Sequence, residues 1–190
     1  DLDPTDGDGL EIKRQRFLQS TGQVIYFDGY TSVADIDLDG VLDLLVASKR
    51  SSETGVTAWN KNGFLRFFRY PNIQYNTSGA VPCVANVFDD RTEGFPVDLP
   101  EILVSNGWNF VAFNLQAHQR DPVAPYWWNI STSTNGSSGH SPAVTFDFNG
   151  DGNQEILLVK NTLQIYYGGA APFPPGVDSN RLWQSFGTGN

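Results

Sequence analysis

Residues 31–48, TSVADIDLDGVLDLLVAS, place an acidic loop between two apolar segments. Its four aspartates, Asp35, Asp37, Asp39 and Asp43, stand at positions one, three, five and nine of the loop. Gly40 follows the third aspartate, where the chain must bend sharply and a positive φ is needed. Alternate carboxylates on a tight turn, with one backbone carbonyl, can supply the roughly six to eight oxygen ligands that Ca²⁺ takes. The stretch therefore predicts a calcium loop between two β-strands.

The pattern returns in PAVTFDFNGDGNQEILLVK, residues 142–160. Asp147, Asn149, Asp151 and Glu155 occupy the same loop positions, and Gly152 stands at the bend. Without a cation, carboxylates this close would repel one another and destabilise the folded chain. Two copies in one register therefore favour a metal site over a merely solvated acidic surface.

An EF-hand loop, the obvious alternative, shares the opening of this motif. That loop requires a bidentate glutamate at its twelfth position and a helix after it. Here the twelfth residues are Val46 and Leu158, within the strand-like runs LLVAS and ILLVK. The acid at position nine closes the loop instead, and the EF-hand interpretation is excluded.

Two looser copies complete a set of four internal repeats. The opening residues 1–13, DLDPTDGDGLEIK, contain four further candidate metal ligands, Asp1, Asp3, Asp8 and Glu11, at altered spacing. Residues 82–107 hold a longer loop that carries Arg91 and lacks the regular acidic core, so we expect no calcium there.

Each acidic motif is followed by further strand-like segments. The candidate third strands are residues 22–27, 55–60, 109–114 and 162–167, and aromatic-rich fourth segments cover residues 64–71, 124–131 and 181–187. A four-stranded antiparallel unit of about 50 residues has the size of a propeller blade. We therefore expect an all-β fold: a β-propeller region over residues 1–190 with about three and a half to four blades visible and little helix. The repeats fall at about 1–30, 31–80, 81–140 and 141–190.

The two regular copies resemble the FG-GAP/VCBS repeat family, which includes the integrin α-subunit propeller. The family pattern is similar to VADIDLDGVLDLLVAS and VTFDFNGDGNQEILLV throughout. The resemblance implies calcium in the hairpin between the first two strands of a blade, bound by the side chains at positions 35, 37, 39, 43, 147, 149, 151 and 155. The carbonyls of Val41 and Asn153 would complete the two sites. The chain lacks an evident FG…GAP sequence, so the resemblance rests on the calcium-loop half of the repeat.

Composition and charge limit the possible partners. The net charge of −9 disfavours nucleic acid and anionic membranes and suits cations. No apolar run is long enough to span a bilayer, so we expect no membrane insertion. Cys83 is the single cysteine, which makes an internal disulfide impossible. Because residue 1 falls inside a motif, we expect a piece of a longer chain, with the rest of that chain or other subunits completing the propeller.

Catalytic signatures are scarce. The two histidines, His118 and His140, lie in no metal-binding or hydrolase motif, and a Cys83–His140 nucleophile pair has nothing specific in its favour. We therefore expect no enzymatic activity. Trp127 and Trp128 are the candidate aromatic contacts for a ligand, since adjacent residues of a strand face opposite ways. Sequons at Asn76, Asn129 and Asn135 have meaning only on a eukaryotic secretory route.

The expected function is a calcium-stabilised propeller module of a secreted or cell-surface protein. It would mediate adhesion, or recognise a protein or glycan, through surface loops presented by the rigid scaffold. The alternative is a non-catalytic propeller domain or structural component attached to an extracellular enzyme or to a larger surface assembly.

Overall fold

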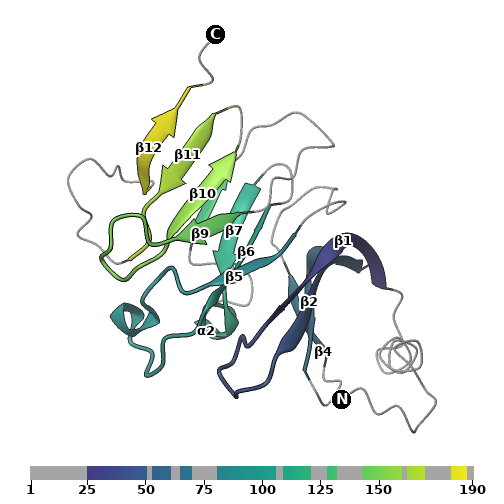
Figure 1. Cartoon of the computed structure of the whole chain (residues 1–190). Coiled ribbons are helices and arrows are strands. Elements are labelled where there is room, and N and C mark those ends of the chain that lie inside the picture. The colour runs from purple at the N-terminus through teal and green to yellow at the C-terminus, as the bar shows by residue number, and fades with distance from the viewer. Residues whose placement is uncertain are drawn as a thin grey trace, which may run out of the picture.

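Three small antiparallel sheets make up the structure, a computed structural model that describes residues 25–50, 53–60, 65–69, 81–105, 109–120, 128–131, 143–159, 162–169 and 181–187. Within these residues each sheet has four strands, and strands adjacent in the chain are adjacent in the sheet (Figure 1). Helix is almost absent, which confirms a mostly β fold. The described residues contain one helical turn, η1 (Asp90–Glu93), and one short helix, α2 (Leu115–Arg120).

The strands follow one another as three consecutive meanders. The first sheet contains β1 (Ile25–Ala34), β2 (Asp43–Arg50), β3 (Glu53–Trp59) and β4 (Leu65–Arg69). The second contains β5 (Cys83–Ala85), β6 (Glu101–Ser105), β7 (Asn109–Phe113) and β8 (Trp128–Ser131). The third contains β9 (Val144–Phe146), β10 (Glu155–Val159), β11 (Leu163–Tyr166) and β12 (Leu182–Phe186).

One predicted strand lies in a different sheet from the one expected. Residues 22–27 were expected as the third strand of the first repeat, but Ile25–Phe27 belong to β1 and pair with β2 at Ser48–Arg50. Because β2 extends to Arg50, its outer edge offers backbone groups that need partners. A register shift between Phe27 and Thr31 lets β1 continue along that edge.

The second sheet lies between the other two, and its β6 strand shows why. Side chains alternate across a strand, so neighbouring residues face opposite sheets. Ile102 and Val104 pack into a cluster with first-sheet residues such as Leu45. Leu103, between them, packs into a second cluster with third-sheet residues such as Ile156. The apolar run of β6 is therefore explained by burial on both faces.

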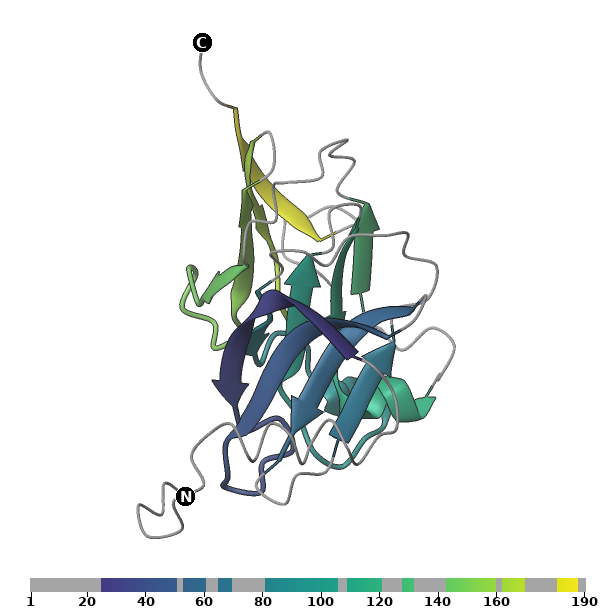
Figure 2. The ribbon, with the colours of Figure 1, turned by 90° about the vertical axis from the view of Figure 1, so that its right-hand side faces the viewer.

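In Figure 1 the second sheet lies between the other two, and Figure 2 views the same stack with the first sheet nearest the viewer. The buried residues of the first cluster come from the first two sheets, from the first acidic loop and from α2 (Leu115–Arg120): Ile36, Leu45, Ala47, Val56, Ala58, Ile102, Val104, Val111, Phe113 and Ala117. Those of the second cluster are Ala85, Val87, Phe88, Leu103, Phe110, Ala112, Ala143, Ile156, Leu158 and Tyr166.

Backbone contacts also join the second and third sheets. The N–H of Gly169 donates to the carbonyl of Val87 at 2.7 Å. At Gly168 a Cβ atom would stand 3.0 Å from the carbonyl oxygen of Val87, so the two chain segments pass too closely there for a side chain. The Arg181 guanidinium lies 4.4 Å from the centre of the Phe88 ring and donates to the Gly169 carbonyl at 2.6 Å. One main-chain hydrogen bond and the Arg181 side chain thus join the second and third sheets.

Helix α2 follows β7 directly and was not predicted. The Asn114 side chain begins it, because its Oδ1 accepts hydrogen bonds from the N–H groups of Gln116 and Ala117 at 3.0 and 2.9 Å. Ala117 then enters the cluster between the first and second sheets. No helix in the described ranges has the length and apolar character needed to cross a membrane.

Candidate metal centre

The first acidic loop joins β1 to β2 and brings three aspartates together. Asp35 and Asp37 are half-buried and Asp39 is exposed. One carboxylate oxygen from each lies within 4.8 Å of the other two. A single cation could contact all three, and carboxylate oxygens are the ligands that hard cations prefer. The Asp35, Asp37 and Asp39 group could therefore hold a metal ion.

Backbone hydrogen bonds hold this loop in shape. The N–H groups of Asp39 and Gly40 donate to the two carboxylate oxygens of Asp35 at 3.1 and 2.8 Å. The N–H of Val41 donates to Asp39 Oδ1 at 2.8 Å. Gly40 adopts a φ of +82°, as expected from its place at the bend. The loop thus positions its carboxylates through its own main chain.

Asp43 stands apart from the other three acids. It is the first residue of β2 and is only 4% exposed. Its Oδ2 accepts a hydrogen bond from the N–H of Ile36 at 3.1 Å, which closes the base of the loop. The structure therefore brings three of the four predicted carboxylates into one group and gives Asp43 a bond to the loop backbone.

The loop between β9 and β10 repeats these hydrogen bonds position for position. The N–H groups of Asp151 and Gly152 donate to the two oxygens of Asp147 at 3.1 and 3.0 Å. The N–H of Asn153 donates to Asp151 Oδ1 at 2.8 Å. Gly152 has a φ of +90°, matching the bend of the first loop. The two loops are therefore copies in conformation as well as in sequence.

Glu155 closes the base of this second loop. Its Oε2 accepts the N–H of Phe148 at 2.8 Å, as Asp43 accepts that of Ile36. Glu155 is fully buried and its Oε1 has no hydrogen-bond partner. Burial raises the pKa of its carboxyl group. A buried carboxylate oxygen without a donor is destabilising, and a cation held by the loop would supply the missing partner.

The second loop differs from the first in its donor set. Asn149 stands where the first loop has Asp37, which leaves one carboxylate fewer. Asp151 Oδ2 accepts hydrogen bonds from Asn149 Nδ2 at 3.0 Å and from the Tyr167 hydroxyl at 3.1 Å. Among the described residues, a group of three close acids occurs at the first loop alone.

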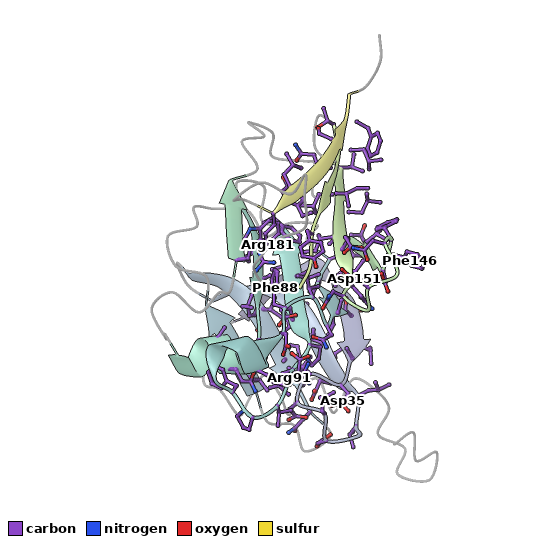
Figure 3. The ribbon with its side chains drawn as sticks, turned by 90° about the vertical axis from the view of Figure 1, so that its left-hand side faces the viewer. Asp35, Phe88, Arg91, Phe146, Asp151 and Arg181 are labelled. Atoms are coloured by element: carbon purple, nitrogen blue, oxygen red, sulfur yellow. The ribbon has the colours of Figure 1, made fainter. Side chains whose placement is uncertain are left out.

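The corresponding loop of the second sheet, between β5 and β6, has a different construction. Arg91 Nε donates to Asp89 Oδ1 at 2.7 Å, and its terminal nitrogen lies 3.9 Å from Asp98. Asn86 Nδ2 also donates to Asp98 at 2.9 Å. Figure 3 shows Arg91 between Asp35 and Asp151 along one side of the molecule, so a guanidinium accompanies the acids of the middle loop.

A buried amide completes that middle loop. Glu101, the counterpart of Asp43 and Glu155, is fully buried and accepts the N–H groups of Val87 and Phe88 at 2.8 and 3.0 Å. Asn114 Nδ2 donates to Glu101 Oε1 at 3.0 Å, to Asp90 Oδ2 at 2.7 Å and to the Leu99 carbonyl at 3.1 Å. The Asn114 amide thus supplies hydrogen-bond donors to the closing acid Glu101 and to the buried Asp90 of the middle loop.

Sequence reasoning missed both Asn114 and Tyr167. They occupy the same place, since each directly follows the third strand of its sheet and reaches into the neighbouring loop. Aligning the repeats on their third strands, rather than on their acidic loops, would have drawn attention to this position.

The buried acids of the middle loop give a pH dependence. Burial raises the pKa of Glu101 to about 8 and that of Asp90 to about 6, against the opposing effect of their hydrogen bonds. Below these values the folded chain keeps protons that the unfolded chain releases above about pH 4. The free energy of unfolding should therefore fall as pH rises from about 5 to 8, by at most about 1.4 kcal/mol per pH unit for each group.

Urea unfolding in chelator at several pH values measures this change of unfolding free energy with pH. Glu101→Gln should flatten it, and an unchanged slope in that variant would contradict the assignment.

The remaining predicted site residues divide into two groups. Asp1, Asp3, Asp8, Glu11 and Trp127 lie outside the described residues. Trp128 is half-buried at the seam between the second and third sheets. Its ring meets those of Phe110 and Tyr166 edge-on, with centroids 5.8 and 5.0 Å apart. In the structure Trp128 packs between sheets.

Comparison of the chain with protein-family models, with curated proteins and with solved structures gave no significant match.

Proposed function

We propose that this chain is a calcium-stabilised β-propeller module. The observation that carries the proposal is that the two loops share one conformation. The same hydrogen bonds surround Asp35 and Asp147, and a buried acid, Asp43 or Glu155, closes the base of each loop. In the first loop Asp35, Asp37, Asp39, the Val41 carbonyl and Asp43 would hold the ion. In the second loop Asp147, Asn149, Asp151, the Asn153 carbonyl and Glu155 would do so.

The arrangement of the sheets supports a propeller. The first and second sheets each use the equivalent face to pack on the following sheet. Leu45 of β2 points towards the second sheet, and the equivalent Leu103 of β6 points towards the third. Four-stranded antiparallel sheets stacked with constant polarity are the units of a propeller. The acidic loops then lie along one side, as Asp35 and Asp151 do in Figure 3.

The role that we assign to the ion is structural. It would replace the repulsion among loop carboxylates by attraction and so stiffen the first hairpin of a sheet. Recognition of a protein or glycan would fall to loops on this scaffold, in a secreted or cell-surface protein without catalytic activity. Extracellular calcium concentrations suit loops of this modest ligand charge.

Calcium titration calorimetry tests the site assignment. Asp37→Ala and Asp151→Ala should each lower the number of bound calcium ions by one, because each removes a carboxylate ligand from a different loop. Asp89→Ala removes the same charge from the middle loop, where Arg91 already pairs with it, and should leave the number unchanged. Equal stoichiometry in all four proteins would contradict the proposal.

The recognition part of the proposal needs a separate measurement. A glycan array and a binding screen against purified extracellular proteins, both with calcium present, distinguish a lectin from an adhesion module. If neither the glycan array nor the protein screen detects binding, the alternative is favoured, namely a structural domain attached to a larger assembly.

A further inference from the structure

Both carboxylate oxygens of Asp151, in the second loop between β9 and β10, accept hydrogen bonds from the chain itself. Asp151 Oδ1 accepts the N–H and the side-chain amide of Asn153 at 2.8 and 3.0 Å. Asp151 Oδ2 accepts Asn149 Nδ2 at 3.0 Å and the Tyr167 hydroxyl at 3.1 Å. A carboxylate has about four lone-pair sites, so these donors use the acceptor capacity of the group. A cation that binds Asp151 therefore has to displace one of them.

Asn149 is engaged at both ends of its amide group. Its Oδ1 accepts the N–H of Asp151 at 2.8 Å, and its Nδ2 donates to Asp151 Oδ2. An amide nitrogen offers hydrogens and no lone pair, so it is not a ligand for a metal ion. The second loop thus presents a hydrogen-bond donor at the position where the first loop has the carboxylate of Asp37.

The first loop has an acid at each of the corresponding places. Asp35, Asp37 and Asp39 each bring one carboxylate oxygen within 4.8 Å of the other two. Ionised carboxylates repel one another, whereas amide and hydroxyl donors attract a carboxylate. Calcium affinity depends on the number of charged ligands, so a cation gains more from the first loop than from the second.

The second loop nevertheless keeps one acceptor for which its own donors do not provide. Glu155 is fully buried, and its Oε1 has no hydrogen-bond partner. Burial raises the pKa of this carboxyl group, and the charges of Asp151 and Asp147 raise it further, so the group lies close to both. Binding a cation would therefore satisfy Glu155 at the cost of hydrogen bonds to Asp151.

Tyr167 reaches this loop from an anchored main chain. Its N–H donates to the Arg181 carbonyl at 2.7 Å, and its carbonyl accepts Arg181 Nη1 at 3.4 Å. The Arg181 guanidinium also lies over the Phe88 ring (Figure 3). Tyr167 is 6% exposed, so the fold holds the residue, and its hydroxyl is the part that can leave Asp151. Asn114, at the corresponding place in the second sheet, likewise donates to acids of its own loop.

We propose that Tyr167 and Asn149 make the second loop the weaker of two calcium sites, because a cation there has to displace their hydrogen bonds to Asp151. The inference rests on calcium binding by both loops, as proposed above. The first loop then fills at a lower calcium concentration than the second. The chain responds to calcium in two steps, and Tyr167 sets the concentration of the second step.

Titration calorimetry on proteins with one intact loop measures each site separately. Asp37→Ala keeps the second loop, and Asp151→Ala keeps the first. Calcium should bind the intact first loop at least about tenfold more tightly, because that loop has one more carboxylate and no amide donor in its place.

Tyr167→Phe tests the part played by the hydroxyl. Added to Asp37→Ala, it should tighten calcium binding by the second loop about three- to tenfold, the net value of one hydrogen bond. Added to Asp151→Ala, it should leave the affinity of the first loop unchanged. Tyr166→Phe is the matched control: it removes the neighbouring hydroxyl, which donates to Gln164 Oε1 at 2.8 Å, and should change neither affinity.

The possible outcomes separate this inference from the calcium proposal. Equal affinities of the two loops, or a second loop that Tyr167→Phe leaves unchanged or weakens, would overturn the inference while both loops still bind calcium. Absence of calcium binding in the parent protein would overturn both. Damage to the fold would weaken the second loop, so it cannot imitate the expected gain in affinity.

Discussion

Replacing Asn114 by leucine should lower the free energy of unfolding by about 3 kcal/mol or more. The Asn114 amide donates to both Asp90 and Glu101, which are 1% and 0% exposed. Leucine has a similar volume but no donor, so two buried carboxyl groups would lose a shared partner. Leaving buried acids unsatisfied costs far more than losing a surface hydrogen bond. Urea unfolding followed by tryptophan fluorescence measures the change.

Asn86→Leu is the matched control for this experiment. It makes the same chemical change in the same loop, at an exposed residue whose amide bonds to Asp98. Its cost should stay within about 1 kcal/mol, because water can replace the lost donor. Comparable losses at Asn86 and Asn114 would show that the buried network has no special importance.

Removing calcium should lower the melting temperature by roughly 10 to 20 °C if both acidic loops bind the ion as proposed. A ligand at 100 times its dissociation constant stabilises the folded state by about 2.7 kcal/mol per site. A chain of this length shifts by about 2 to 4 °C per kcal/mol. Melting curves in millimolar calcium and in excess chelator give the difference directly.

A double variant, Asp37→Ala with Asp151→Ala, shows whether the shift acts through the loops. Its melting temperature should no longer respond to calcium, because each loop has lost a ligand. A calcium response that persists in the double variant would place the ion elsewhere. Identical melting curves of the parent protein in calcium and chelator, with no metal found by elemental analysis, would remove the calcium proposal altogether.

The repeated motif made the order of strands and the conformation of two loops predictable. Asp35 and Asp147 lie in matching turns because local spacing, a glycine at the bend and nearby N–H groups determine those turns within a few residues. The third and fourth strands of the three sheets also fall where their alternating or aromatic segments predict them, whereas residues 22–27 do not form the third strand expected of the first repeat. These features depend on short-range pattern, which the sequence displays directly.

Contacts between distant segments could not be read in the same way. Asn114 donates a hydrogen bond to Asp90, which lies 24 residues earlier in the chain. No sequence pattern around an asparagine at the end of a strand predicts so distant a partner. The pairing of Ile25–Phe27 with β2 likewise depends on where the register shift falls, which alternation alone leaves open. Both findings are contacts between segments that are distant in the sequence. Such contacts depend on how the sheets assemble.

The burial of the second sheet on both faces has a consequence for how the chain folds. Its central strand has no side that water could solvate, since Leu103 and Ile102 are both within 1% of complete burial on opposite faces. Such a sheet cannot be a stable intermediate by itself, and it gains its stability only as both neighbours dock. We therefore expect the three sheets to form one cooperative unit, in which the middle repeat couples events at the two ends.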